Sequence, residues 1–382
     1  MIQRDAEKKV RLYARQFRAL AIVGPRQSGK TTLARQVFPR KPYVSLEDPD
    51  ERTMAVEDPR YFLKRFKNGA IIDEAQRVPD LFSYLQGLLD STRRNALFVL
   101  TGSNHFMLNE SISQSLAGRI GYIDLLPLTI SEILRFSRSL SDADSWMLSG
   151  GYPEVYDKKR NPAIWYPAYI RTYVERDVRL IKNIGSTSLF TKFLRICAGR
   201  IGQLINLSAI SNECGIELKT VQSWLSILES SFIIFLLKPH HVNFNKRLVK
   251  SPKLYFYDTG LACSLLGIST TSELSLSHFR GSLFENAIVS EKLKIENNKL
   301  KGAQLFFWRD NKGVEIDLLS DTGRKVVPTE IKSGSTFNTS FLQNLVRWNE
   351  LSGNQGGELI YGGNKTYELS TKIKVKSWKD VG

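Results

Sequence analysis

Short apolar runs alternate with helix-like segments over the N-terminal part of the chain. Residues 19–23 (ALAIV), 70–72 (AII) and 97–100 (LFVL) are continuously apolar, which is typical of parallel strands that are buried on both faces. The segment TTLARQVF, which follows the first run, has the character of a helix. This alternation predicts a doubly wound α/β layer with a mainly parallel sheet, whose ligands bind at the carboxyl edge of the strands.

The middle of the chain changes character after the turn-rich GGYP at residues 150–153, beyond which helical segments dominate. Residues 207–213 and 219–229 predict two helices joined by a tight turn, and the second helix carries Val221, Leu225 and Leu228 on one face. Two strand-like runs, SFIIFLL and KLYFYD, follow this pair. The order predicts a winged helix-turn-helix subdomain.

The C-terminal segment predicts a helix that opens at residues 281–285, and then paired strands at 304–309, 314–319 and 326–332. A length of 382 residues fits two or three domains. We therefore expect an α/β chain with three domains, at residues 1–145, 146–275 and 276–382.

Composition and charge narrow the classes of partner. The formal net charge is +16, and residues 151–250 carry 15 Lys and Arg against 7 Asp and Glu, which is half of the excess. Both a polyanion partner and simple solubility explain such a balance. No apolar run approaches the roughly 20 residues that span a bilayer. The polar start has no signal-peptide core, so we expect a cytoplasmic protein without a membrane partner.

Cysteine usage gives no sign of a metal centre. Cys197, Cys214 and Cys263 lie far apart, and the pair His240 and His241 has no partner at ligand spacing. We expect reduced thiols and no zinc.

The first apolar run leads into GPRQSGKT at residues 24–31, the strand, turn and helix context of a phosphate-binding P-loop. Backbone N–H groups of such a loop surround the β-phosphate, and the helix N-terminus adds its positive dipole. Lys30 is expected to reach the β- and γ-phosphates of ATP, and the Thr31 hydroxyl to bind Mg²⁺. The residues expected around the nucleotide are Gly24, Pro25, Arg26, Gln27, Ser28, Gly29, Lys30, Thr31 and Thr32.

The second apolar run ends in Asp73 and Glu74. Taken alone, an acidic pair after a strand also fits a helix N-terminus or an exposed loop. With the P-loop upstream, Asp73 is expected to bind Mg²⁺ and Glu74 to activate the attacking water. The third run ends in TGSN, where Ser103 or Asn104 is expected to position that water.

Arg119 lies in SLAGRIG and is a candidate arginine finger, able to stabilise charge on the transferring phosphoryl group. A surface arginine is the alternative reading. If Arg119 acts on another copy of the chain, the protein must form a homo-oligomer.

Acidic residues also recur in the C-terminal segment. Period two puts Glu330 and Lys332 on one face of a predicted strand. Asp317 lies on the preceding predicted strand, and we expect it to share a metal with Glu330. Glu285 near the start of an apolar helix face completes the group. Carboxylates that bind Mg²⁺ beside a lysine suit phosphodiester hydrolysis. A solvated acidic face is the alternative.

Several motifs together suggest a family. They are GPRQSGKTT, AIIDEAQ, VLTGSN, SLAGRI, GGYPE and YVERDV. Over nearly its whole length the chain resembles the prokaryotic AAA+-like ATPases that carry a C-terminal domain of unknown function, the DUF4143 family.

The resemblance implies an AAA-type ATPase core, a winged-helix linker and a restriction-endonuclease-like C-terminal fold. It implies that the ATPase residues keep the roles given above. The terminal segment looks like a PD-(D/E)xK nuclease core with helix, second-strand and ExK positions in order. These positions are Glu285, Asp317, Glu330 and Lys332.

Together these features lead us to expect a Mg²⁺-dependent ATPase associated with DNA, in which nucleotide state positions the other modules. Cleavage of DNA by the C-terminal domain is a further hypothesis, which the resemblance by itself does not establish. One alternative is a nucleotide-gated binding protein with an inactive nuclease-like domain. The predicted recognition helix carries a single basic residue, Lys219, which leaves this alternative open. A small-molecule phosphotransferase is a second alternative, although Glu74 suits water activation better.

Overall fold

The computed structural model describes residues 2–103, 116–137, 140–174, 186–241 and 249–381. They divide into two compact units. The first contains Met1–Leu128 with the short segments Ser230–Phe232 and Asn298–Leu300, and the second contains the rest. The second unit thus holds most of the segments that we assigned to two separate domains, and their division remains a prediction.

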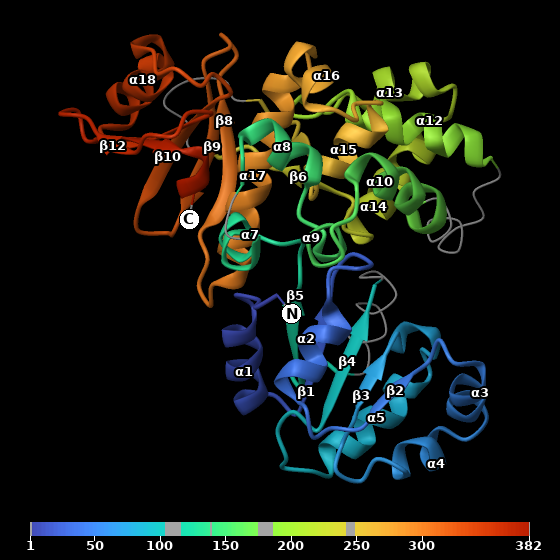
Figure 1. Cartoon of the computed structure of the whole chain (residues 1–382). Helices are drawn as coiled ribbons and strands as arrows, with labels where there is room; N and C mark the ends of the chain where they lie inside the picture. The colour runs from blue at the N-terminus through green and yellow to red at the C-terminus, as the bar shows by residue number, and fades with distance from the viewer. Residues whose placement is uncertain (1, 104–115, 138–139, 175–185, 242–248, 382) are drawn as a thin grey trace. The chain divides into compact units, whose positions relative to one another are not determined.

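The first unit is built on a parallel sheet (Figure 1). Its described strands are β1 (Ala19–Val23), β2 (Tyr43–Ser45), β3 (Ile71–Asp73), β4 (Phe98–Gly102) and β5 (Ile120–Asp124). They follow the order β2-β3-β4-β1-β5, and every neighbouring pair is parallel. The expected parallel α/β layer is confirmed. Because β4 lies between β1 and β3, the residues that follow these three strands meet at one edge.

Helices cover the sheet of the first unit. They are α1 (Glu7–Gln16), α2 (Lys30–Val37), α3 (Pro49–Glu57), α4 (Pro59–Lys64), η1 (Ala75–Arg77) and α5 (Leu81–Asp90). Val10 of α1 and Leu33 of α2 share a buried apolar cluster with Leu20 and Ile22 of β1. All five residues of β1 are buried, so the strand has no solvent-facing side that would favour polar residues.

The second unit begins with helices. Those that lie wholly or mainly in it are α7 (Ile130–Ser137), α8 (Ala143–Ser149), α9 (Pro153–Asp157), α10 (Pro162–Tyr169), η2 (Ile170–Val174), α12 (Thr187–Ala198), α13 (Leu207–Cys214), α14 (Leu218–Ser230), α15 (Thr259–Leu265), α16 (Thr271–Leu276), α17 (Arg280–Asn298), η3 (Thr339–Leu342), α18 (Gln343–Ser352) and η4 (Trp378–Asp380). The two helices predicted at 207–213 and 219–229 are α13 and α14. Gly215 ends α13 in the left-handed conformation, with φ 74°.

The GGYP segment has a structural role at the end of α8. Gly150 has φ +61°, and a Cβ there would lie 2.1 Å from the Tyr166 hydroxyl oxygen. The Gly151 N–H donates to buried Asp258 at 2.7 Å, and the other oxygen of Asp258 accepts from the Leu261 N–H at the start of α15. Gly150 therefore lets the backbone approach a buried carboxylate, because a Cβ there would also lie 2.5 Å from an Asp258 oxygen.

Two antiparallel strands, β6 (Ile234–Leu237) and β7 (Lys253–Phe256), follow α14. Leu204, in the loop between α12 and α13, forms a bridge with Lys253 of β7. Pro239, just after β6, forms a bridge with Phe307 in the C-terminal sheet. The hairpin is therefore bonded to the loop between α12 and α13 and, through the residue after β6, to the C-terminal sheet.

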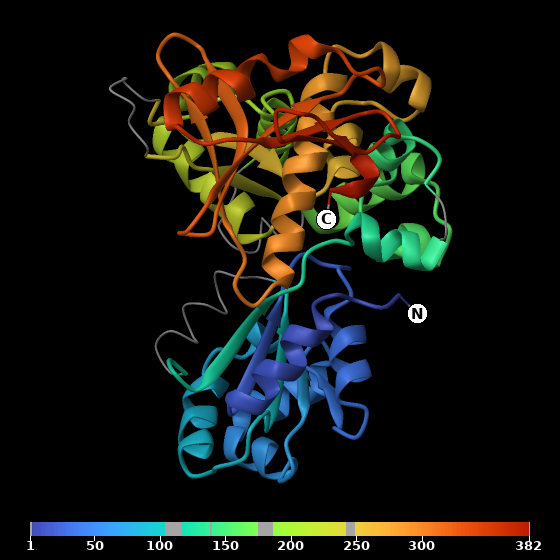
Figure 2. The ribbon, with the colours of Figure 1, turned by 90° about the vertical axis from the view of Figure 1, so that its left-hand side faces the viewer.

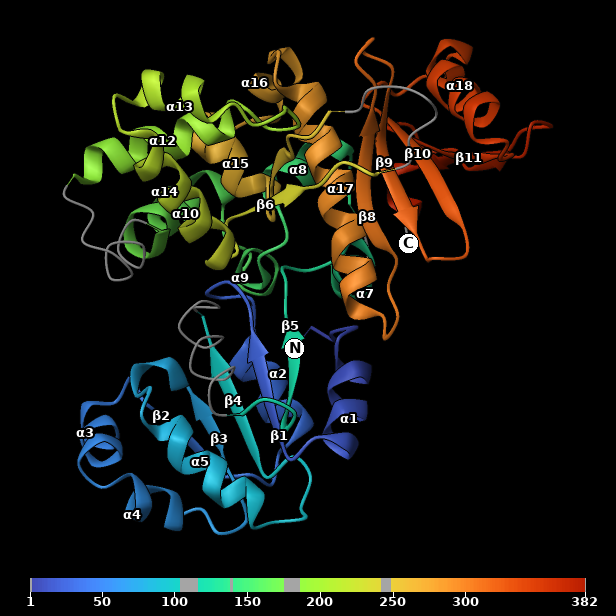
Figure 3. The same cartoon turned by 180° about the vertical axis from the view of Figure 1, so that it is seen from behind.

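The C-terminal sheet is mixed. Its described strands are β8 (Gln304–Arg309), β9 (Glu315–Asp321), β10 (Val326–Lys332), β11 (Gly357–Tyr361), β12 (Tyr367–Glu368) and β13 (Ile373–Ser377), in the order β12-β13-β11-β10-β9-β8. Trp308 and Trp348 pack edge to face in its core. Figure 2 shows α17 as a long orange helix, and Figures 1 and 3 show it beside β8. Helix and sheet together position the C-terminal acidic residues.

Within the described residues, no helix is both long and apolar enough to cross a membrane. Cys197, Cys214 and Cys263 are free and buried.

Candidate functional site

The P-loop joins β1 to α2 as the sequence pattern predicted. The Lys30 ammonium is buried and donates to the carbonyl oxygens of Gly24 at 3.1 Å and Pro25 at 2.8 Å. The Ser28 hydroxyl is buried and makes no hydrogen bond among the described residues. Because α2 begins at Lys30, its first N–H groups lack partners inside the helix and point out of its end. The loop thus offers donors to an anion.

Backbone approach explains the first glycine of the loop. A Cβ on Gly24, whose φ is +149°, would lie 2.2 Å from the carbonyl oxygen of Leu125. Arg4 fastens the loop from the other side, because its guanidinium donates to the carbonyl oxygens of Ser28 and Leu126, each at 2.6 Å. Arg4 is buried. The motif did not indicate this residue.

Asp73 lies beside Thr31 at the carboxyl edge of the sheet. The Thr31 hydroxyl donates to the first Asp73 oxygen at 2.9 Å, and Thr101 of β4 donates to the same oxygen. Tyr43 donates to the second oxygen at 2.9 Å. Burial and the Asp73 carboxylate raise the pKa of Tyr43 to about 12, so Tyr43 remains a donor. In a Mg²⁺ octahedron with bonds of about 2.1 Å, neighbouring ligand oxygens lie about 3 Å apart. The Thr31 and Asp73 oxygens have about this separation, so the two fit as neighbouring Mg²⁺ ligands.

Glu74 follows β3 in a left-handed conformation, with φ 53° and ψ 43°. Such a conformation costs a non-glycine residue about 1–3 kcal/mol and is often held at functional sites. The Glu74 carboxylate accepts hydrogen bonds from Gln76 and, at 3.1 Å, from the Ser103 hydroxyl. The structure therefore brings Ser103 to Glu74. Asn104, the other proposed water-positioning residue, lies outside the described residues.

Arg119 lies at the other edge of the sheet. It directly precedes β5, and the register pairs Ala19 with Ile120 and Val23 with Asp124. The length of β1 therefore separates it from the P-loop, roughly 16 Å at 3.3 Å per residue. Arg119 makes a bidentate ion pair with Asp90, with N···O distances of 2.6 and 3.0 Å. The structure does not bring Arg119 to the phosphate loop of its own chain.

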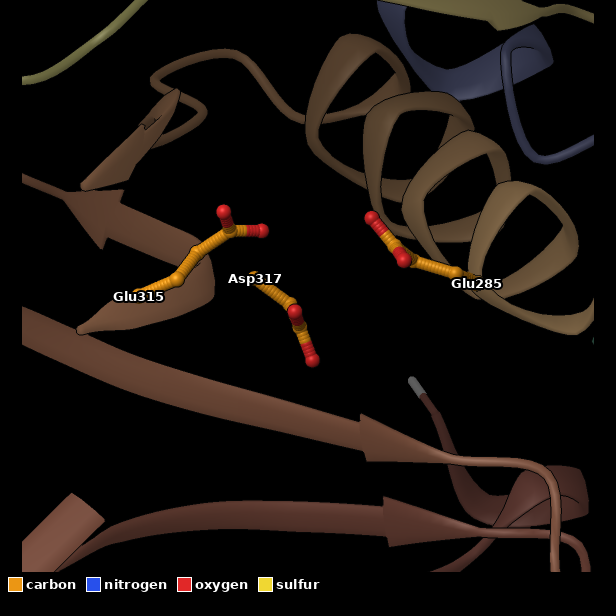
Figure 4. A group of neighbouring side chains, drawn as sticks. All are labelled: Glu285, Glu315 and Asp317. Atoms are coloured by element: carbon orange, nitrogen blue, oxygen red, sulfur yellow. The ribbon is translucent and has the colours of Figure 1, made fainter. Parts of the chain in front are cut away.

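The C-terminal acidic residues converge in the second unit (Figure 4). Glu285 projects from α17 toward Glu315 and Asp317 of β9, and ligand oxygens of the three residues lie within 4.8 Å of one another. Asp317 accepts a hydrogen bond from the Ile331 N–H at 2.8 Å, which fixes it against β10. Carboxylate oxygens are the kind of ligand that Mg²⁺ and Mn²⁺ prefer. We call Glu285, Glu315, Asp317 and Glu330 the carboxylate cluster.

Glu330 and Lys332 lie on one face of β10, as their spacing predicted. The Glu330 carboxylate accepts from Lys332 at 2.6 Å and from Asn344 at 3.0 Å through one oxygen, and its other oxygen is buried without a hydrogen bond. Burial raises the pKa of Glu330, although Lys332 opposes this shift. Burial, together with the carboxylates of Glu330 and Glu285, raises the pKa of Asp317 well above its ordinary value. A nearby cation would stabilise the ionised form of both carboxyl groups.

Two residues of β7 also enter the carboxylate cluster. The Lys253 ammonium contacts Glu285 at 3.1 Å and also pairs with Glu315, and the Tyr255 hydroxyl donates to Glu285 at 2.5 Å. Burial lowers the pKa of Lys253, but Glu285 and Glu315 raise it by more, so it stays protonated. Lys253 lies in a run that we assigned only to a wing strand. Its alternation with Tyr255 in KLYFYD was the available signal.

A basic groove lies along α12. This groove, about 760 Å³ in volume, is lined by Lys192, Arg195 and Arg200, with Glu213 as the one acid among its lining residues. Arg200 pairs with Glu213 at 2.5 Å. Two residues further along, a Cβ on Gly202 would lie 3.4 Å from both Glu285 carboxylate oxygens. The segment that follows Arg200 therefore passes beside Glu285.

Family models match three parts of the chain. Residues 16–134 match an AAA domain, residues 140–272 match a domain of unknown function named DUF8612, and residues 280–381 match a domain of unknown function named DUF4143.

Two uncharacterized proteins are similar over most of the chain. One from Mycobacterium tuberculosis is 31% identical over 338 residues, which are 87% of this chain and 74% of that protein. One from Methanocaldococcus jannaschii is 24% identical over 359 residues, 84% of this chain and 75% of that protein. Among solved structures, the Walker-type ATPase of Pyrococcus abyssi aligns with a TM-score of 0.44 at 15% identity, over 69% of this chain and 96% of that one.

Proposed function

Because the chain belongs to the family of P-loop ATPases that carry a C-terminal DUF4143 domain, we propose that residues 1–145 hydrolyse ATP to ADP and phosphate with Mg²⁺. The observation that carries this proposal is the meeting of Lys30, Thr31 and Asp73 at one edge of the parallel sheet. Thr31 and Asp73 would hold Mg²⁺, which when bound would supply positive charge to the β- and γ-phosphates. Lys30 leaves two backbone carbonyls to bind those phosphates, and Glu74, held by Ser103, acts as the base that activates the attacking water.

Release of inorganic phosphate from ATP tests this proposal. Turnover is expected in Mg²⁺ and is expected to vanish when EDTA removes the metal, because Thr31 and Asp73 then have no ion to hold. ATP binding without release of phosphate to water would instead support a nucleotide-gated switch. Transfer of the γ-phosphate to another acceptor would support a phosphotransferase.

We further propose that Arg119 acts on the nucleotide of a neighbouring copy of the chain. Its place at the edge opposite the P-loop supports this, since a guanidinium at that distance cannot reach the phosphates of its own chain. Mixing Arg119→Ala with Lys30→Ala protein should recover part of the turnover, because one copy supplies the arginine and the other an intact P-loop. Asp90→Asn serves as a control that removes the ion-pair partner but keeps the arginine. No recovery in the mixture would count against action between copies.

A second activity, metal-dependent cleavage of DNA, is proposed for the carboxylate cluster. The observation that favours it is the buried Glu330 oxygen without a hydrogen bond, beside Asp317 and Lys332. Asp317 and Glu330 would hold a divalent ion, which supplies a polarised water when bound. The Lys332 ammonium would stabilise the charge that develops on the phosphate.

Nicking of supercoiled and branched DNA with Mg²⁺ or Mn²⁺, with and without ATP, tests the second activity. Cleavage that stops on chelation is the expected result. Absence of cleavage on either substrate, with ATP hydrolysis intact, would favour the binding module.

We propose that α12, α13, α14 and the β6-β7 hairpin form the winged helix, and that its basic groove binds the DNA backbone near the carboxylate cluster. The three basic residues of the groove support this, because non-specific affinity for DNA comes mainly from cations near phosphates. Arg200 is held by Glu213, whereas Lys192 and Arg195 are exposed on α12. Their cationic ends are available to phosphates.

Replacing Lys192 and Arg195 by alanine should weaken DNA binding and flatten its dependence on salt by about one unit of slope per residue. Fluorescence anisotropy over a salt series measures both. The control replaces Arg324 and Lys325, which are exposed in the turn between β9 and β10, at the opposite end of these strands from Glu315 and Lys332. This control changes the charge equally. Equal losses in the two variants would point to net charge and not to the groove.

A further inference from the structure

Lys253 is the buried cation of the carboxylate cluster that the proposed cleavage reaction does not use. Its side chain is 3% exposed, and its ammonium contacts both Glu285 and Glu315. The Phe307 ring closes another side, with the ammonium 5.6 Å from the ring centroid. The two carboxylates and the aromatic face together satisfy the charge of this buried ammonium.

Tyr255 holds this arrangement from the same strand. Lys253 and Tyr255 are two residues apart on β7, so their side chains project from one face. The Tyr255 hydroxyl donates to the same Glu285 oxygen that Lys253 contacts. Glu285 thus receives two donors from β7, and both would have to move before a metal ion could take their oxygen.

The charge balance within the cluster also disfavours a metal ion between Glu285 and Glu315. Among the described residues, four carboxylates face three cationic side chains. The carboxylates are those of Glu285, Glu315, Asp317 and Glu330, and the cations are Lys253, Arg309 and Lys332. Even with all four acids ionised, one divalent ion overcompensates the remaining formal charge, and a second would add strong repulsion from Lys253 at close range.

The cluster also separates into two parts. Lys332 and Asn344 hold one oxygen of Glu330, and the other oxygen is buried without a hydrogen bond. On the other side, Glu285 and Glu315 already share a cation. Phosphodiester hydrolysis with two metal ions requires a positive charge at two places, about 3.5–4 Å apart. In this chain the Lys253 ammonium already provides a positive charge between Glu285 and Glu315.

We propose that the Lys253 ammonium takes the place of a second divalent ion between Glu285 and Glu315, so that the cluster binds one Mg²⁺ or Mn²⁺, at Asp317 and Glu330. This inference rests on the proposed cleavage site, whose metal it assigns to one part of the cluster. It gives β7 a defined part in that site. The hairpin supplies a fixed positive charge that chelation cannot remove.

Counting bound Mn²⁺ by paramagnetic resonance of the free ion tests this. The full-length chain is used without nucleotide, and every protein carries Asp73→Asn so that the P-loop does not contribute an ion. The parent should bind one Mn²⁺. Lys253→Met, which keeps the apolar stem and removes the charge, should bind two, and adding Glu315→Gln should return the count to one. Lys250→Met, an exposed lysine just before β7, should stay at one.

Thermal unfolding gives a second readout. Without metal, Lys253→Met leaves Glu285 and Glu315 facing each other without their shared cation, so its Tm should fall below that of the parent. Mn²⁺ should raise the Tm of this variant more than that of the parent, because the variant binds one more ion in the folded state. A variant that loses stability and does not regain it in Mn²⁺ would overturn the inference.

The outcomes separate this inference from the proposed cleavage site. Two ions in the parent, or one ion in Lys253→Met, would overturn the role of Lys253 and leave the metal site at Asp317 and Glu330 intact. No ion in the parent, with one gained in Lys253→Met and lost again with Glu315→Gln, would support Lys253 as the resident cation. That result would remove the metal from the proposed cleavage site.

Discussion

Replacing Glu74 by glutamine is expected to lower ATP turnover by about 10²- to 10⁴-fold while ATP still binds, because a general base contributes about this much to hydrolysis. Glutamine keeps the size of the side chain and an oxygen that can accept from Ser103, whose hydroxyl lies 3.1 Å from the Glu74 carboxylate. It cannot take the proton of the attacking water. Turnover and nucleotide affinity, measured on the same protein, separate the two effects.

Two further variants serve as controls for the Glu74→Gln protein. Lys30→Met should lose both nucleotide binding and turnover, because the buried ammonium at the P-loop is the cation that reaches the phosphates. Glu57→Gln alters an exposed acid at the end of α3 and should behave as the wild type. A Glu74→Gln protein that keeps half or more of the wild-type rate would show that another group activates the water.

Replacing Asp317 by asparagine should abolish DNA cleavage and, in metal-free buffer near neutral pH, raise thermal stability. Loss of a metal ligand removes several kcal/mol of charge stabilisation from the transition state. About 2.7 kcal/mol already corresponds to a 100-fold lower rate. The gain in stability has a separate cause. Burial and the carboxylates of Glu330 and Glu285 raise the pKa of Asp317, so its anion is disfavoured in the folded chain.

The sign of the pH dependence follows from that shift. Because the folded pKa is raised, the stability that Asp317 contributes is complete below the unfolded pKa of about 3.9. It is lost as pH rises through the folded pKa. The metal-free wild type should therefore lose stability over this range, and Asp317→Asn should lose less. Each kcal/mol corresponds to about 2–4 °C in Tm for a unit of 150–250 residues.

Differential scanning calorimetry in EDTA from pH 4 to 8 measures this dependence. Glu368→Gln, an exposed acid on β12 of the same sheet, provides the control and should follow the wild type. An Asp317→Asn protein that is less stable than the wild type near neutral pH would show that the carboxylate is stabilised without metal, contrary to its buried surroundings. Cleavage that persists in this variant would remove Asp317 from the proposed metal site.

Local sequence patterns predicted much of the fold and of the nucleotide site. An apolar run, a glycine turn and a helix at 19–37 need only neighbouring residues to specify them, and they form β1, the P-loop and α2. The acidic pair at 73–74 follows a strand in the same way. Period two on β10 puts Glu330 and Lys332 on one face, and they bond to each other. Such features depend on backbone geometry within a few residues, which is why the chain alone revealed them.

Contacts between distant segments had no such signature. Strand order brings Thr101 and Tyr43 to Asp73, and the same order puts Arg119 at the far edge of the sheet. Lys253 reaches Glu285 and Glu315 from a hairpin that is bonded both to the loop between α12 and α13 and to the C-terminal sheet. Long-range pairing is decided by how whole faces pack and which edges meet. Local chemistry therefore determined which groups this chain offers, and tertiary packing decided which of them meet.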